Sequence, residues 1–102
     1  MGLPTNGWKN KNGTSDRPNC DCGTWKQHWI NGTGKTWPIL CSVEGCMETA
    51  SDGAHLINEN SDIKGEWIAP TCKGCNHRTD TFSLKLGTTL YPANVSKTCG
   101  KK

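Results

Sequence analysis

The apolar positions of the chain fall in short clusters, which predict short elements. Trp25, Trp29 and Ile30 stand at i, i+4 and i+5, the spacing of one apolar face of a helix. Thr24 precedes them as a possible N-cap, and the run Asn-Gly-Thr-Gly at 31–34 stops a helix. We therefore expect a short helix between this cap and this stop.

Four other apolar runs have the length of strands: 37–41, 54–57, 67–70 and 88–91. The gap between the second and third runs suits a hairpin loop. Residues 75–84 predict a second short helix. Residues 1–19 are rich in Asn, Gly, Lys and Pro without periodicity, so they predict a flexible N-terminal arm. Residues 20–102 would then form one small α+β domain.

The composition limits the size of the apolar core. Only 32% of the 102 residues are apolar, with a single Phe and a single Tyr, and five tryptophans supply much of the bulk. A core this small benefits from cross-links. Seven cysteines can provide them.

Zinc explains the cysteines better than disulfides do. Their number is odd, most fall in close pairs, and the chain starts without a signal peptide. Structural zinc takes four Cys or His ligands. Cys41 and Cys46 would form one half of a site on a tight turn, and Cys72 and Cys75, which open the second predicted helix, the other half. We predict that these four bind one structural zinc.

Three thiols remain for a second structural zinc: Cys20, Cys22 and Cys99. One histidine would complete this set. His28 lies six residues after the second of these cysteines and is the preferred ligand, with His77 and His55 as alternatives. Such a site would tie the C-terminal tail back to the region of residue 20.

Charge is spread unevenly around a net +3. Residues 39–63 carry five acidic side chains and no Lys or Arg, whereas both flanking segments are basic. The basic ends could bind nucleic-acid phosphates, and the acidic middle could bind a basic protein surface. No apolar run approaches the roughly 20 residues of a membrane span. We expect a cytoplasmic protein with no membrane partner.

The order of the motifs resembles the HNH endonuclease family, of ββα-metal fold, over roughly residues 41–80. The motifs are Cys41…Cys46, Gly-Ala-His at 53–55, and Pro-Thr-Cys-Lys-Gly-Cys-Asn-His at 70–77. The resemblance implies a treble-clef zinc core over about 41–84, with His55 as general base and Asn76 on a catalytic Mg²⁺ or Mn²⁺ that acts on nucleic acid. The whole chain is also similar to small bacterial and phage zinc proteins.

Two positions depart from the family pattern. Ala54 stands where the family has the Asp that binds the catalytic metal. Trp67 stands near the position at which the family has its middle Asn. Mg²⁺ prefers carboxylate ligands, so we expect weak or absent hydrolysis unless Asp52 or Glu59 compensates. His55 would otherwise bind the second zinc or pack beneath the hairpin. The alternative function is a non-catalytic, zinc-stapled interaction module that binds and modulates another protein.

Overall fold

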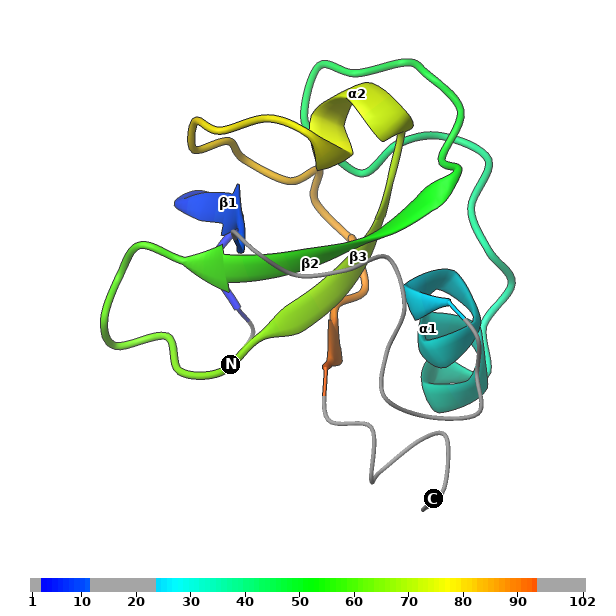
Figure 1. The fold of residues 1–102 in the computed structure, drawn as a ribbon, viewed down its shortest axis with the longest axis horizontal. Helices are drawn as coiled ribbons and strands as arrows, with labels where there is room; N and C mark the ends of the chain where they lie inside the picture. The colour runs from blue at the N-terminus through cyan, green and yellow to red at the C-terminus, as the bar shows by residue number, and fades with distance from the viewer. Residues whose placement is uncertain (1–2, 12–23, 94–102) are drawn as a thin grey trace.

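The computed structural model describes residues 3–11 and 24–93. In chain order the elements are β1 (Trp8–Asn10), α1 (Trp25–Thr33), β2 (Asp52–Asn58), β3 (Trp67–Thr71), α2 (Lys73–Asn76) and β4 (Tyr91–Pro92). The strands form one antiparallel sheet in the order β1-β2-β3-β4 (Figure 1). This is the small α+β fold with two short helices that the sequence predicted. Neither of the helices described is long and apolar enough to cross a membrane.

The β2–β3 hairpin is the centre of the sheet, and the prediction of two strands joined by a hairpin loop is confirmed. Its register pairs Ala54 with Ala69 and His55 with Ile68. Successive side chains of a strand point to opposite faces. Ala54 and Leu56 therefore lie on one face, here called the cysteine face, and His55 lies on the other, here called the helix face.

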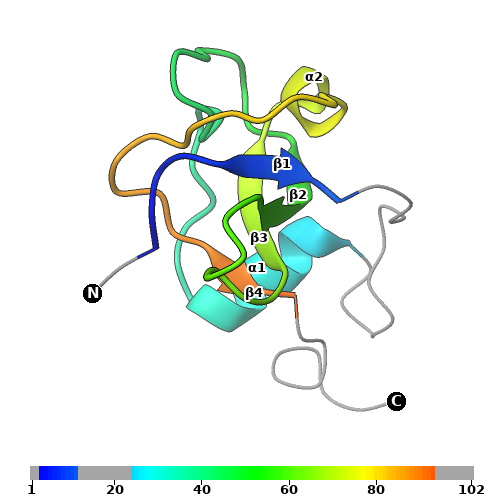
Figure 2. The ribbon, with the colours of Figure 1, turned by 90° about the vertical axis from the view of Figure 1, so that its left-hand side faces the viewer.

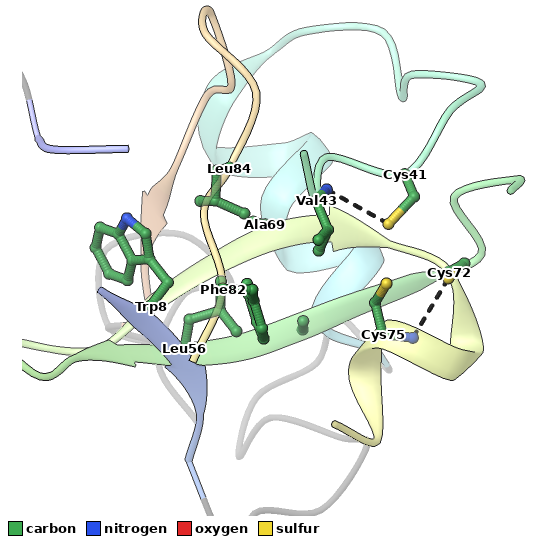
Figure 3. Packing of buried hydrophobic residues seen from close by; sticks show 10 residues of the cluster. Trp8, Cys41, Val43, Leu56, Ala69, Cys72, Cys75, Phe82 and Leu84 are labelled. Atoms are coloured by element: carbon green, nitrogen blue, oxygen red, sulfur yellow. Dashed lines mark hydrogen bonds between the residues drawn. The ribbon is translucent and has the colours of Figure 1, made fainter. Parts of the chain in front are cut away.

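The cysteine face holds the larger buried cluster (Figure 3). Its members come from every element except α1 and β4, and from the loops on either side of the hairpin: Trp8, Cys41, Val43, Ala54, Leu56, Ala69, Cys72, Cys75, Phe82 and Leu84. Three of the ten are cysteines, so thiol groups form part of the core.

Helix α1 covers the helix face, where Trp25 and Trp29 pack against Ile68. Thr24 caps the helix as predicted, because its Oγ1 accepts a hydrogen bond from the Gln27 N–H at 3.1 Å. The helix continues to Thr33, three residues further than predicted. It ends only at Gly34, whose φ of 69° is in the left-handed region that glycine adopts without strain.

The segment 3–11 differs from the predicted arm. Its strand β1 pairs with the end of β2, and the Trp8 side chain is fully buried. The indole N–H donates to the carbonyl of Pro4 at 2.9 Å, and the Trp8 backbone exchanges two hydrogen bonds with Phe82. One buried indole thus holds a segment whose other residues are mostly polar.

Three further predicted elements are corrected by the structure. Residues 37–41 form no strand beyond an isolated bridge between Leu40 and Thr49. The helix predicted over 75–84 ends at Asn76, because Phe82 and Leu84 turn back onto the cysteine face. The run predicted as a strand over 88–91 contributes only the first residue of β4.

Candidate metal centre

Four cysteine side chains meet at one end of the sheet. The Sγ atoms of Cys41, Cys46, Cys72 and Cys75 all lie within 4.8 Å of one another. Cys46 Sγ and Cys72 Sγ are 3.7 Å apart. A tetrahedral zinc with Zn–S bonds of about 2.3 Å holds its sulfur ligands about 3.8 Å apart. The four thiols that the sequence grouped together therefore have the chemistry and the spacing to hold one Zn²⁺.

The first pair lies on a loop of residues 39–50, here called the cysteine loop. The Cys41 N–H donates to the carbonyl of Glu48 at 2.8 Å, and the Cys46 N–H to that of Val43 at 3.0 Å. Gly45, with a φ of 85°, allows the tight turn between the thiols. The Val43 N–H also points at Cys41 Sγ, at 3.5 Å. The loop therefore presents both sulfurs on the same side.

The second pair lies at the start of α2. Cys72 is the N-cap residue, and its Sγ accepts a hydrogen bond from the Cys75 N–H at 3.3 Å. Figure 3 shows the sulfur atoms of Cys41, Cys72 and Cys75 turned toward the same space. An N–H donor favours the thiolate form of the cysteine that it contacts. The Cys75 N–H thus stabilises the negative charge of the Cys72 thiolate.

The environment moves the pKa values of these thiols in different directions. Burial raises the pKa of Cys41 and of Cys75. Burial also acts to raise the pKa of Cys72, but the Cys75 N–H and the neighbouring thiols outweigh it, so that this pKa lies below its usual range. Zinc binds thiolates, so binding releases protons and weakens as the pH falls.

The site is closed. Three of the cysteines are buried and Cys46 is half-buried. Four protein ligands leave a tetrahedral zinc no position for water, which is the arrangement of structural sites. The Lys85 ammonium donates to the Cys46 carbonyl at 2.7 Å and fastens the loop to the segment after α2. An ion here would hold together the cysteine loop, the hairpin and α2.

His55 lies on the helix face. It is only 8% exposed, its Nε2 is 2.7 Å from Glu66 Oε1, and its ring meets the edge of Trp25. Its Nδ1 is buried and has no hydrogen-bond partner among the described atoms. Sequence analysis missed Glu66, although its spacing of two from Ile68 places it on the face that His55 occupies.

Asn76 has a different carboxylate partner. Its Nδ2 donates to Asp52 Oδ2 at 3.1 Å, and the Lys73 ammonium is 3.8 Å from the same oxygen. A cavity of about 220 Å³ lies beside these groups and is also lined by Lys26. Glu59, the other carboxylate considered, is exposed beyond the end of β2. The structure thus brings Asn76 together with Asp52, and His55 together with Glu66.

His28 is fully buried on α1. Its Nε2 is 2.9 Å from the carbonyl oxygen of Pro92, which can only accept, so Nε2 carries the hydrogen. Burial lowers the pKa of His28 despite this hydrogen bond, and the neighbouring His55 lowers it further. His77 is exposed, with Nδ1 donating to the Lys73 carbonyl. The other predicted ligands of the second zinc lie outside the described residues: Cys20, Cys22 and Cys99.

Both residues that depart from the HNH pattern contact the core of the cysteine face. Ala54 is fully buried in the cluster of the cysteine face, and Trp67 packs against that cluster. A carboxylate in place of Ala54 would be buried among apolar side chains. No protein-family model, curated protein or solved structure matches this chain.

Proposed function

We propose that this chain is a zinc-stapled interaction module, which acts by binding another protein and not by hydrolysis. The observation that carries the proposal is the closed cluster of four thiols, whose sulfur atoms lie within 4.8 Å of one another. A zinc ion with four protein ligands would stabilise the fold and would hold no water that could react. The order of cysteine loop, hairpin and short helix supports a treble-clef-like core over about 41–84.

The arrangement of the residues implied by the HNH resemblance supports the same proposal. His55 is buried against Trp25 and engages Glu66, whereas the Asn76 amide is engaged by Asp52. By strand alternation, Asp52 and His55 belong to opposite faces of β2. A general base and a metal ligand that act on one phosphate must instead converge on a single point.

The test joins metal analysis to a nuclease assay on the full chain. We expect bound zinc, a folded protein and no nicking of supercoiled plasmid with Mg²⁺ or Mn²⁺. A protein that folds without zinc would remove the structural role of the four cysteines. Metal-dependent nicking that co-purifies with the wild-type chain would overturn the non-catalytic proposal.

A second structural zinc, on Cys20, Cys22, His28 and Cys99, is part of the proposal. The support is the hydrogen bond from His28 Nε2 to a backbone carbonyl, because histidines that bind metals through one ring nitrogen commonly donate from the other in this way. Elemental analysis should then give two zincs for the wild type and one for His28→Gln. The matched variant His77→Gln should keep both. One zinc in the wild type would contradict the second site.

An HNH-type nuclease that acts on nucleic acid is the second candidate function. The observation that favours it is the meeting of Asp52 and Asn76 beside a cavity lined by Lys26 and Lys73. Carboxylate and amide oxygens suit Mg²⁺ or Mn²⁺, which would stabilise charge on a phosphate, and lysines attract phosphates.

Four variants examine this candidate in the plasmid assay. Nicking that is lost in Asp52→Asn, Asn76→Ala and His55→Ala but kept in Glu59→Gln would establish the nuclease. If neither the wild type nor any of the four variants nicks the plasmid, while zinc content and folding are unchanged, the result would support the interaction module and not the nuclease.

A further inference from the structure

The four thiols of the candidate centre differ in their access to solvent. Cys46 is half-buried, whereas Cys41, Cys72 and Cys75 are buried. Met47, the next residue along the chain, is 74% exposed, so the turn that carries Cys46 faces water. Oxidation of cysteine by small molecules follows the exposure of its sulfur. A reagent in solution therefore meets this centre first at the Cys46 sulfur.

Cys72 is placed to react with an oxidised Cys46. Their Sγ atoms are 3.7 Å apart, so a disulfide bond of about 2.05 Å requires them to approach by about 1.7 Å. The Cys75 N–H donates to Cys72 Sγ at 3.3 Å, which favours the thiolate, the form that attacks another sulfur. An oxidised sulfur at Cys46 would thus have a nucleophile directly beside it.

The same two thiols belong to segments that are distant along the chain. Cys46 lies on the cysteine loop, and Cys72, 26 residues later, lies where β3 passes into α2. Figure 2 shows this loop and α2 at the same end of the molecule. A covalent bond between the two thiols would therefore tie the loop to the hairpin, as a bound zinc would. Such a cross-link stabilises a fold mainly by restricting the unfolded chain.

We propose that the candidate centre is a redox switch, in which a hydroperoxide converts Cys46 and Cys72 to a disulfide and the zinc leaves. The Cys46 thiolate first attacks hydrogen peroxide, so that an S–O bond forms, the O–O bond breaks and hydroxide departs. The Cys72 thiolate then attacks the Cys46 sulfur, so that the S–S bond forms, the S–O bond breaks and a second hydroxide departs. Each hydroxide takes up a proton and becomes water. The two sulfurs lose two electrons in total, and the peroxide gains them.

The disulfide removes half of the zinc ligands. Sulfur binds zinc as a thiolate, so only Cys41 and Cys75 of the four-cysteine cluster would still bind the ion. The helix face takes no part in this chemistry, because its described cluster of Trp25, Trp29 and Ile68 contains no cysteine. A dithiol reductant, added with zinc, should restore the first state. This inference goes beyond the proposed function and needs only the zinc on the four cysteines.

The test is a peptide map of the zinc-loaded full chain after treatment with hydrogen peroxide and alkylation of the remaining thiols. Trypsin cleaves after Lys73, between the second pair of cysteines, and Glu-C protease cleaves after Glu44, between the first pair. Each of the four cysteines then lies on a peptide of its own. We expect peptide 45–48 joined to peptide 67–73, and zinc lost from the protein in step with this joined species.

Two variants separate the thiol from its exposed neighbour. Cys46→His keeps four zinc ligands but removes the accessible thiol, so Cys72 should lose its free thiol at least about tenfold more slowly in peroxide. Met47→Leu removes the exposed thioether beside it and should behave as the wild type does. The oxidised wild type should also unfold at a higher urea concentration than the reduced wild type stripped of zinc with EDTA, because the disulfide replaces the lost tie.

Several outcomes would overturn the redox switch. Disulfides within either pair of cysteines, zinc retained after the joined peptide has formed, or zinc lost while Cys46 stays reduced would each do so. Because the peptide map uses the wild type, it decides the matter even where Cys46→His does not fold. These failures would leave a zinc-loaded, non-cleaving protein and the proposed function intact. Metal-dependent nicking would overturn the proposed function and leave the switch untouched.

Discussion

The two faces of the hairpin are filled by different chemistry. On the cysteine face the core includes thiols at a candidate zinc site, and the cysteine loop that carries two of them contains no described helix or strand. On the helix face a capped helix brings aromatic rings to the sheet, and Trp29 meets Trp37 edge to face at 5.3 Å. The sheet is thus covered on one side by apolar side chains together with the candidate metal ligands, and on the other mainly by the indoles of α1.

This contrast shows two ways in which a chain poor in Leu, Val and Phe can stabilise its fold. Indoles bury a large area each and fix their position with the ring N–H, as Trp29 does at the Thr89 carbonyl. The cysteine loop contains no helix or strand, and ordering it costs conformational entropy that a bound metal would offset. We therefore expect the cysteine face to depend on metal and the helix face to depend on close packing.

Removing the metal should have the largest effect. Structural zinc contributes on the order of 10 kcal/mol in small fingers, comparable to the whole stability of a domain of this size. Cys72→Ser, or a strong chelator, should therefore abolish cooperative unfolding, measured by circular dichroism and amide exchange. His77→Ala, on the surface beside α2, should not. Native tryptophan fluorescence that survives metal removal would show that the helix face folds alone and would sharpen the contrast.

Close packing of the helix face can be broken at Gly53. A Cβ at this position would lie 2.6 Å from the Lys26 backbone nitrogen and 2.6 Å from the Trp25 carbonyl carbon. Backbone cannot move aside locally, so Gly53→Ala should push α1 off β2 and cost about 3 kcal/mol in urea unfolding.

Gly74 is the matched control on the cysteine side. A Cβ there would have its nearest neighbour, Cys72 Sγ, at 4.0 Å, so Gly74→Ala in α2 should change stability little or raise it slightly. Equal loss in both variants would mean that the two faces are packed equally tightly and would remove the distinction.

Acid should also act on the helix face, through His28. Burial depresses its pKa, so the folded state binds fewer protons than the unfolded state. Its contribution to stability is present above the unfolded value of about 6.5 and is lost as the pH falls toward the folded pKa. The free energy of unfolding should fall by at most about 1.4 kcal/mol per pH unit in this window. His28→Gln removes the titrating ring, so it should reduce the slope whether burial alone or the proposed second zinc keeps the imidazole unprotonated.

The smallest effect should come from the contact that joins the two regions. The Trp37 indole N–H donates to the Ala50 carbonyl at 2.8 Å, at the end of the cysteine loop. Ala50 is buried, so Trp37→Phe leaves the Ala50 carbonyl without a hydrogen-bond donor and should cost about 1 kcal/mol in urea unfolding. Trp67→Phe, whose indole bonds locally to the Lys64 carbonyl at an exposed position, should cost less. A larger loss of stability in Trp67→Phe than in Trp37→Phe would mean that the cysteine loop is not stabilised by its contact with the helix face.

Sequence pattern predicted the elements that local chemistry determines. Thr24 caps α1, strands flank the hairpin loop, and the four cysteines of the candidate centre lie together. Each of these was predictable because helix caps, strand alternation and the spacing of paired ligands depend on residues that are close together in the sequence. Strand β1 was missed because its only large apolar side chain, Trp8, is buried by residues far along the chain. The alternation of Phe82 and Leu84 was a strand-like signal inside a predicted helix, and it indicated the return to the core.

Asn10 links the start of the chain to the end of α2. Its amide donates to the carbonyls of Cys75 and Arg78, 65 and 68 residues away, each at 2.9 Å. A ribosome releases the N-terminal end first, so β1 emerges long before these acceptors exist. Contacts at such separation form late and slowly. Strand β1 is thus synthesised well before the residues that hold it in place, and a nascent chain stalled before residue 75 would lack both of these acceptors for Asn10.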